Sequence, residues 1–548
     1  MSESRFLSLP PEVLLEICRH LAAPMQKASS SHWCRFRVND SSGTKTRDPD
    51  VLACGVALAR LIRTCKAMHS VAGCMLYPGY YNIRHPSEAF TFFPSFPPRI
   101  TSRSRRTFDN GALNRGSEME IPSRPQYREL VGHVQIHNDS TLDMDCSEEQ
   151  MSSLDADWLT NAADRLGISF PNDWNKCRLE CGPQDHVAKY IAQLLLRYLP
   201  NLLSLKVTLT RPWKFTLLKN WIQTNEIAHN AFLWTLKNLT IHLRSIEARS
   251  SPSHRIILNS ASYLTTLHVH DTCSFRIPKG IRLEHLRSLT FASCSMDRSS
   301  MKNALQATPK LISFEYHARP STAQNTHKRP LLTPRMLCQL LSNDFDRTEP
   351  PLRNGRGEVV SAVLPEFHRQ LRMLVIDFPV GEDESTWWKR EETIANMRDF
   401  RLLKHLSIDA GSITCRSQGG GIIVNDLNEL IPEKLEGLAI TRVGECFDYL
   451  VQTSLPELSR ELRNGRSSSL HRVGILHCAI DEFTRYNALH SLRRLFVWRI
   501  RIGVCNSWFE GEISKVTDTR IVQPPGHATS PVLEESFKGF RDVMKNSS

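Results

Sequence analysis

The sequence predicts an α/β fold in which a small helical module at the N-terminus precedes an irregular solenoid with parallel strands and outer helices. Two observations lead to this prediction. The motif L-x-x-L-x-[apolar] recurs ten times between Leu202 and Val497, and segments with helical spacing separate many of the copies. Two apolar segments with helical spacing, 9–21 and 51–77, come before the repeats. Alternating strands and helices favour a parallel sheet covered by helices.

The first helix is expected in "LPPEVLLEICRHL", residues 9–21. Pro11 suits the first helical turn, where its missing N–H would have no intrahelical partner, and Glu12 complements the positive end of the helix dipole. Val13, Ile17 and Leu21 recur at intervals of four residues, and neighbouring apolar side chains make the apolar face broader than one buried face requires. This helix therefore needs a cover, either from the rest of the chain or from a partner.

A second apolar helix is expected within 51–77. Its spine has helical spacing and consists of Leu58, Leu61, Ile62, Cys65 and Met68. A polar stretch rich in Ser, Lys, Arg and Asp separates the two helices and predicts a loop insert at 22–55.

Together the two segments resemble the F-box family. Its pattern is a Leu-Pro, an acidic residue and an apolar helix, then a helix of the form L-x-x-L-x-x-[VT]-C-[KR] and a Leu-aromatic pair. The matching residues run from Leu9-Pro10 through Thr64-Cys65-Lys66 to Leu76-Tyr77. The chain departs from the family in the long insert between the helices and at Met68-His69.

An F-box packs its apolar face against the Skp-type adaptor of an SCF ubiquitin ligase. The resemblance therefore implies that this adaptor covers the N-terminal helix. The implied adaptor-binding residues are Leu9, Pro10, Glu12, Val13, Leu14, Ile17, Leu21, Leu58, Leu61 and Cys65. The alternative is that both helices cap the domain that follows, as terminal repeats do in solenoids.

The motif copies begin at leucines that are mostly 22 to 35 residues apart: Leu202, Leu236, Leu264, Leu286, Leu311, Leu371, Leu403, Leu435, Leu470 and Leu492. One interval of 60 residues indicates a repeat that is obscured or replaced by an insertion near 318–362. The last three positions of each copy alternate, which is strand periodicity. The pattern resembles the leucine-rich-repeat fold, although the asparagine that normally follows the strand in that family is mostly absent.

The expected organisation has four parts: the helical module at 1–80, a linker and irregular segment at 81–126, the repeat solenoid at 127–510 and a C-terminal tail at 511–548. Connectors with helical spacing are expected to form the outer helices, at 186–200, 300–309, 448–464 and 481–492.

Side chains between and just after the motif leucines are expected on the concave face, because strand side chains alternate between faces. In successive repeats these are Lys206, Thr208, Thr240, His242, His268, His270, Thr290, Ala292, Glu315, His317, Val375, Asp377, Ser407, Asp409, Ala439, Thr441, Phe496 and Trp498. We expect a substrate to contact His268, His270, Glu315, Asp377, Arg494, Phe496 and Trp498, since Trp and Arg are favoured interface residues. The alternative for the last three is a final strand covered by the C-terminal segment.

Composition limits the location and the partners. Hydrophobic residues make up 41% of the chain, but no run approaches the roughly 18 to 20 apolar residues that cross a bilayer. The 15 cysteines, odd in number and without a CxxC pair, indicate a reducing compartment, so we expect the cytoplasm and/or the nucleus. The net charge of +12 permits acidic partners, but the basic residues are spread out, and we expect neither nucleic acid nor a membrane as a partner.

Motifs for catalysis and cofactor binding are absent from the sequence. It contains no GxGxxG, GxxxxGK[ST], GxSxG or HExxH, and "QGGGIIVND", residues 418–426, reads as a flexible connector. His268, His270 and Cys273 lack a visible fourth ligand for zinc. We therefore expect no catalytic residue, no cofactor and no metal.

These expectations combine into one functional prediction: a non-catalytic substrate-recognition subunit of an SCF-type E3 ubiquitin ligase. The F-box would bind the Skp-type adaptor and through it the cullin-RING core, and the repeats would bind a protein substrate. The alternative is a leucine-rich-repeat scaffold for protein interactions without a ligase role, in the nucleus or associated with nucleic acid.

Overall fold

The computed structural model of this 548-residue chain describes residues 13, 20, 80–83, 132–138, 163–164, 166, 193–194, 196–209, 233–243, 253–272, 275–277, 280–319, 332–342, 365–379, 388–394, 396–416, 422–443, 449–464, 469–470, 472–476 and 501–505. By its internal contacts the chain divides into two compact units. The first comprises Met1–Trp33 and Asn39–Leu264, and the second comprises Cys34–Val38 and Thr265–Ser548.

The described part of the first unit contains four strands that pair in parallel and in chain order: β1 (Tyr80–Ile83), β2 (His133–Asn138), β3 (Ser204–Leu209) and β4 (Asn238–Leu243). Helix α12 (Ser253–Ser260) follows β4. Strand β1 was not predicted. It begins at the end of the expected helical module and extends into the segment expected to be a linker.

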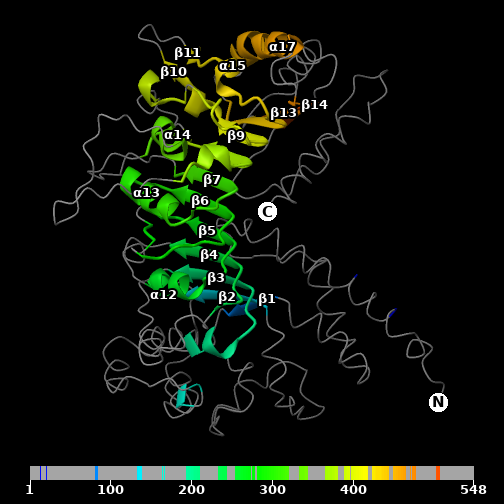
Figure 1. Ribbon diagram of the computed structural model, residues 1–548. Coiled ribbons are helices and arrows are strands. Elements are labelled where there is room, and N and C mark those ends of the chain that lie inside the picture. The colour runs from blue at the N-terminus through cyan, green and yellow to red at the C-terminus, as the bar shows by residue number, and fades with distance from the viewer. Residues whose placement is uncertain are drawn as a thin grey trace, which may run out of the picture. The chain divides into compact units, whose positions relative to one another are not determined.

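The second unit carries eight parallel strands among its described residues, again in chain order: β5 (Thr266–His270), β6 (Ser288–Cys294), β7 (Ser313–Ala318), β8 (Met373–Asp377), β9 (His405–Asp409), β12 (Gly437–Thr441), β13 (Arg472–Leu476) and β14 (Arg501–Cys505) (Figure 1). The predicted α/β class with a parallel sheet is therefore confirmed. Strand β14 was not predicted from the repeat pattern. The last motif copy, 492–497, lies outside the described residues.

Helices connect several strands of the second unit. Helices α13 (Arg298–Gln306) and α14 (Pro334–Ser342) lie on the same side of β6 and β7 (Figure 1). A π-helical turn leads into α17 (Leu455–Arg463). Helices α13 and α17 overlap two of the predicted helical connectors, and α14 occupies part of the long interval between motif copies. No helix in the described part of the chain has the length and apolarity needed to cross a membrane.

A short antiparallel pair, β10 (Thr414–Arg416) with β11 (Ile422–Val424), lies outside the parallel order. The interpretation of 418–426 as a flexible connector is therefore wrong for its second half. Ile422–Val424 forms a strand because its β-branched residues pair with β10. Asp426 then caps helix α15 (Leu427–Leu430) by accepting a hydrogen bond from the Asn428 N–H at 2.8 Å.

The motif leucines form the apolar interior. The first leucine of every motif copy that the structure describes is buried: Leu202, Leu236, Leu264, Leu286, Leu311, Leu371, Leu403, Leu435 and Leu470. The two alternate positions in each following strand are buried as well, for example Leu374 and Ile376 in β8. Fully burying one such side chain contributes about 1.5–3 kcal/mol relative to leaving it exposed, so the repeated motif is the main source of the interior.

An aromatic row crosses the interior of the second unit. The Phe291 ring of β6 lies edge-on to Phe275 at 5.9 Å, to Phe314 at 6.4 Å and to Tyr316 at 6.5 Å. Tyr316 in turn lies 5.0 Å from Phe378, which immediately follows β8. The Tyr316 hydroxyl donates to the Cys294 carbonyl at 3.1 Å and accepts from the Met296 N–H at 3.3 Å, so its polar end is satisfied inside the core.

Candidate functional site

Side chains that point away from the apolar interior form two rows across the second unit. The first row has the register His268, Thr290, Glu315, Val375, Ser407, Ala439, Gly474 and Gly503 in successive strands. In the second row His317 of β7 pairs with Asp377 of β8, and Asp409 of β9 pairs with Thr441 of β12. Apart from Gly474 and Gly503, these are positions that the strand alternation assigned to one face.

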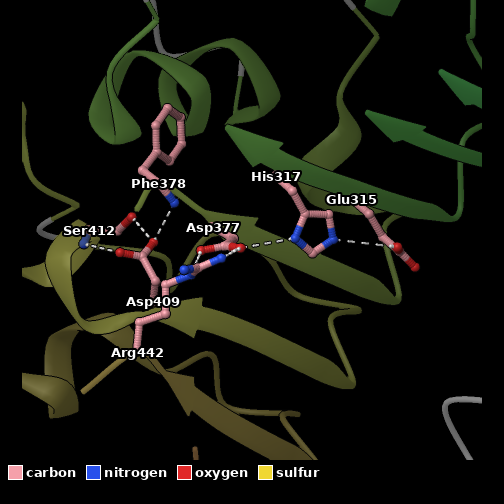
Figure 2. Close-up of polar contacts among 7 residues, drawn as sticks. All are labelled: Glu315, His317, Asp377, Phe378, Asp409, Ser412 and Arg442. Atoms are coloured by element: carbon pink, nitrogen blue, oxygen red, sulfur yellow. Dashed lines mark hydrogen bonds and ion pairs between the residues drawn. The ribbon is translucent and has the colours of Figure 1, made fainter. Parts of the chain in front are cut away.

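Five ionisable side chains gather at the carboxyl ends of β7, β8, β9 and β12: Glu315, His317, Asp377, Asp409 and Arg442, named the polar cluster below (Figure 2). His317 stands between two carboxylates. Its Nδ1 lies 3.2 Å from Asp377 Oδ2, and its Nε2 lies 3.9 Å from Glu315 Oε2. With a carboxylate facing each ring nitrogen, the protonated imidazole can donate to Asp377 from Nδ1 and form an ion pair with Glu315 through Nε2.

Arg442 approaches Asp377 from the other side. Its Nε donates to Asp377 Oδ1 at 2.7 Å, and its Nη2 donates to Oδ2 at 3.2 Å, which is the bidentate geometry of strong Arg–carboxylate pairs. Arg442 follows β12, and β9 lies between β12 and β8. Its φ of 51° is left-handed, a conformation that few residues other than glycine adopt. Arg442 lies in this turn at the end of β12, and its side chain extends across β9 to Asp377.

Asp409 joins the end of β8 to the turn after β9. Its Oδ2 accepts the Phe378 N–H at 2.8 Å, and its Oδ1 accepts the Ser412 N–H at 3.0 Å. The Ser412 hydroxyl also donates to Oδ2. Asp409 is thereby the N-cap of a 3-10 turn, Ala410–Ile413, and the same carboxylate connects the polar cluster to the backbone of the aromatic row.

The charges of the polar cluster shift one another's pKa values. Burial alone would lower the pKa of His317, but Asp377 and Glu315 outweigh it and raise the pKa to about 9. Burial would likewise raise the pKa of Glu315 and of Asp377, yet the hydrogen bond and the charge of His317 lower both. Arg442 adds to the lowering at Asp377. Near neutral pH the cluster therefore holds two carboxylates and two cations in pairs.

Asp409 behaves in the opposite way. Burial and the negative charge of Asp377 raise the pKa of Asp409 to about 7, although the hydrogen bonds from Ser412 and from the Phe378 N–H oppose this. Two carboxylates this close in a buried site favour one protonated form. Asp409 is therefore the member of the cluster whose charge changes near neutral pH.

We predict that replacing Asp409 with asparagine flattens the pH dependence of stability between about pH 4 and pH 7. In that window the unfolded chain has lost the Asp409 proton, because the ordinary pKa is 3.8, while the folded chain keeps it up to about 7. The free energy of unfolding of the natural chain should therefore fall as pH rises, by a few kcal/mol at most, since one pKa unit corresponds to about 1.4 kcal/mol. Denaturant unfolding at several pH values measures this slope.

The matched control for this prediction is Asp426→Asn, which changes an exposed N-cap carboxylate that accepts a single backbone N–H. Its slope should equal that of the natural chain. His317 gives a second decline between about pH 6.5 and pH 9, because the folded chain holds that proton longer than the unfolded chain. That second decline should survive in Asp409→Asn. A variant whose slope below pH 7 is unchanged would contradict the role of Asp409.

The arrangement is suited to noncovalent recognition. Glu315 and His317 keep side-chain exposed fractions of 25% and 21%, whereas Asp377 keeps 6%. A partner would therefore meet a carboxylate beside an imidazolium whose orientation is held from behind by Asp377 and Arg442. Within the described ranges, no group of three or more His, Cys, Asp or Glu side chains is arranged to hold a metal ion.

The structure places some of the predicted site residues and leaves others outside its described part. Glu315 and Asp377 belong to the polar cluster. His268 lies in register with Glu315 two strands away, and His270 lies two residues further along the same face of β5. Of the predicted adaptor-binding residues, Val13 alone is described; it is helical, and its side chain is 42% exposed. Three predicted substrate contacts lie outside the described residues: Arg494, Phe496 and Trp498. The remaining predicted adaptor contacts lie outside them as well.

Sequence reasoning missed Arg442 and Ser412. Arg442 follows the motif copy that ends at Thr441, so the alternation of the strand did not extend to it. The available signal was an unexplained arginine directly after a strand whose neighbours end in Asp377 and Asp409. Ser412 could have been found as the third residue after Asp409, the spacing of an N-cap hydrogen bond.

Comparison with known proteins adds no relative to this picture. No protein-family model matches the chain, and no curated protein matches its sequence.

Proposed function

We propose that this chain is a non-catalytic substrate receptor of an SCF-type E3 ubiquitin ligase. Residues 1–80 would form the F-box that binds a Skp-type adaptor and through it the cullin-RING core. Residues 127–510 would form a leucine-rich-repeat solenoid that holds a protein substrate. The contribution of such a receptor is positioning, because a substrate held near the ubiquitin-loaded enzyme presents its lysines at a high effective concentration.

The observation that carries the adaptor half of the proposal is the exposure of Val13. This aliphatic side chain lies at a helical position and is 42% exposed. It belongs to the set that the F-box resemblance assigns to the adaptor. The exposure of Val13 supports this assignment, because a residue that contacts the adaptor must be accessible before the adaptor binds.

The repeats support the substrate half. In each unit, consecutive strands pair in parallel and in chain order, and the motif leucines are buried. This is the local arrangement that a repeat solenoid requires, since each repeat buries its apolar face against its neighbours. The polar side chains on the other face of the same strands would then contact the substrate.

Within the proposed substrate face, Glu315 and His317 are partly exposed, and His268 and His270 are partly exposed as well. His268 and His270 lie on the same face, and Arg494, Phe496 and Trp498 remain part of the proposal from the sequence alone. Asp377 is better placed as a positioning residue, because it is almost fully buried and holds His317 and Arg442.

The proposal predicts that Val13→Asp weakens adaptor binding. Co-expression of the full chain with a Skp-type adaptor should yield a stable complex, and the substitution should weaken it at least about tenfold, because a carboxylate without a partner would be buried in an apolar contact. The measurement is co-purification followed by a binding titration.

The matched control is Leu203→Asp, which places the same charge at another aliphatic side chain of similar exposure, 40% against 42% for Val13. This variant should bind the adaptor like the natural chain. If the natural chain does not bind the adaptor, or if both substitutions weaken binding equally, the F-box proposal fails. The leucine-rich-repeat scaffold without a ligase role would then be the better account.

A further inference from the structure

A column of equivalent residues runs along the turns that precede the strands of the second unit. The Arg287 carbonyl accepts the N–H groups of Ile312 and Ser313 at 2.8 and 2.9 Å, and the Ile312 carbonyl accepts those of Arg372 and Met373. The Arg372 carbonyl does the same for Lys404 and His405. Each carbonyl thus fixes the next turn, and the column places Arg287, Ile312, Arg372 and Lys404 at the spacing of neighbouring strands, about 4.8 Å.

Five exposed cations lie on these turns: Arg287, Lys310, Arg372, Arg401 and Lys404, named the basic edge below. They come from four consecutive turns, those before β6, β7, β8 and β9. Arg287 leans toward the next turn, where its Nη1 donates to the Lys310 carbonyl at 3.2 Å. The basic edge is therefore a continuous feature and is held in place by backbone hydrogen bonds.

Most of this positive charge is not compensated. Lys404 pairs with Glu436 at 2.6 Å, and the nearby Glu366 pairs with Arg369 at 2.7 Å. Arg287, Lys310, Arg372 and Arg401 form no ion pair with any residue in the described ranges. Like charges on neighbouring turns repel one another. An anionic partner would therefore reduce the electrostatic repulsion within the basic edge.

An apolar side chain interrupts the basic edge. Leu402 stands between Arg401 and Lys404 and is 42% exposed. An exposed aliphatic residue surrounded by cations fits a ligand that offers both carboxylates and an apolar side chain. The aromatic residues of these turns, Phe367 and Phe400, are buried, so the basic edge lacks the exposed rings on which nucleic-acid bases stack.

We propose that the basic edge binds an extended acidic polypeptide segment, with an apolar side chain of that segment seated on Leu402. Same-side side chains of an extended chain recur about every 6.6 Å, so a few alternating carboxylates can face cations that span about 14 Å across three strand intervals. Charge complementarity of this kind directs association and selects the partner. The positive net charge of the whole chain, +12, favours the same class of ligand.

This surface is distinct from the polar cluster and does not depend on the ligase proposal. The basic edge lies at the amino ends of β6 to β9, and the polar cluster lies at the carboxyl ends of β7, β8, β9 and β12. A chain that failed to bind a Skp-type adaptor would still be expected to bind the acidic segment.

The test is a fluorescence anisotropy titration of the full chain. The probe is a short labelled peptide in which Glu alternates with Ser around one central Leu. Saturable binding is expected that weakens as salt is added. Reversing three cations, Arg287→Glu, Arg372→Glu and Arg401→Glu, should raise the dissociation constant at least about tenfold, and Leu402→Ser should raise it severalfold.

A matched triple variant, Arg335→Glu, Arg390→Glu and Arg460→Glu, makes the same change in net charge at exposed arginines outside these turns. It should bind the peptide within about twofold of the natural chain if the basic edge is the site. Equal losses in both triple variants, no saturable peptide binding, or tighter binding of an oligothymidylate than of the peptide would each overturn the proposal. If the first triple variant unfolds, the double variant Lys310→Glu and Arg372→Glu tests the same surface.

Discussion

Replacing Arg442 with methionine is expected to lower the free energy of unfolding by up to about 3 kcal/mol, because it removes one of the two cations that neutralise the nearly buried carboxylate of Asp377. Asp377 is nearly buried and receives two hydrogen bonds from Arg442, so His317 would remain as its main counter-charge. Methionine keeps much of the aliphatic stem and has a Cβ like arginine. The left-handed backbone at this position is therefore equally strained in both chains.

The matched control for Arg442→Met is Lys404→Met. Like Arg442→Met, it removes the cation of an ion pair. The pair is Lys404–Glu436 at 2.6 Å, and both of its side chains are substantially exposed. Its cost should stay below about 1 kcal/mol, as for other exposed pairs. Urea unfolding of both variants provides the comparison. If Arg442→Met costs no more than Lys404→Met, the ion pair does not organise the polar cluster.

Truncating Phe291 to alanine is expected to lower the free energy of unfolding by about 3–5 kcal/mol, the usual range for removing a buried aromatic ring. The Phe291 side chain is fully buried and lies edge-on to three other rings. These rings come from different strands and connectors, so they cannot all move to fill one cavity. The cavity term therefore adds to the lost transfer free energy.

Two further variants separate packing from general sensitivity to substitution. Phe291→Leu keeps much of the volume and should cost clearly less than Phe291→Ala. Leu402→Ala removes an aliphatic side chain that is largely exposed, and its effect should stay within about 0.5 kcal/mol. Thermal or urea unfolding monitored by circular dichroism measures all three. A cost for Phe291→Ala close to that of Leu402→Ala would mean that the aromatic row contributes little to stability.

The aromatic row and the polar cluster are linked through one residue. The Phe378 ring packs on Tyr316 and on Trp388, while the Phe378 N–H donates to Asp409. A shift in the packing of the aromatic row would therefore move the Phe378 N–H and with it the hydrogen bond to Asp409 on the other face of the sheet. Hydrogen bonds from the Phe378 and Ser412 N–H groups hold the Asp409 carboxylate in this buried position.

The sequence by itself determined the strand faces and the apolar interior. Leu374 and Ile376 are buried, and Val375 and Asp377 lie on the other face, because side chains alternate along a strand whatever surrounds it. The parallel order followed from helical connectors such as α13, since a chain that returns along a helix enters the next strand in the same direction. The F-box resemblance and the substrate contacts expected within residues 492–498 also rest on local sequence patterns, and both stay predictions.

The tertiary structure alone decided which polar residues meet. Arg442 and Asp377 are separated by 65 positions in the chain, and Glu315 and Asp377 by 62, so no local pattern connects them. The register of β7, β8 and β9 brings His317 beside Asp377, and a left-handed turn accompanies the reach of Arg442 across β9. The basic edge arises in the same way, from carbonyls that align one turn with the next. Local periodicity specifies the face on which a side chain lies, whereas its partners depend on strand register and turn geometry, which are set by packing over the whole chain.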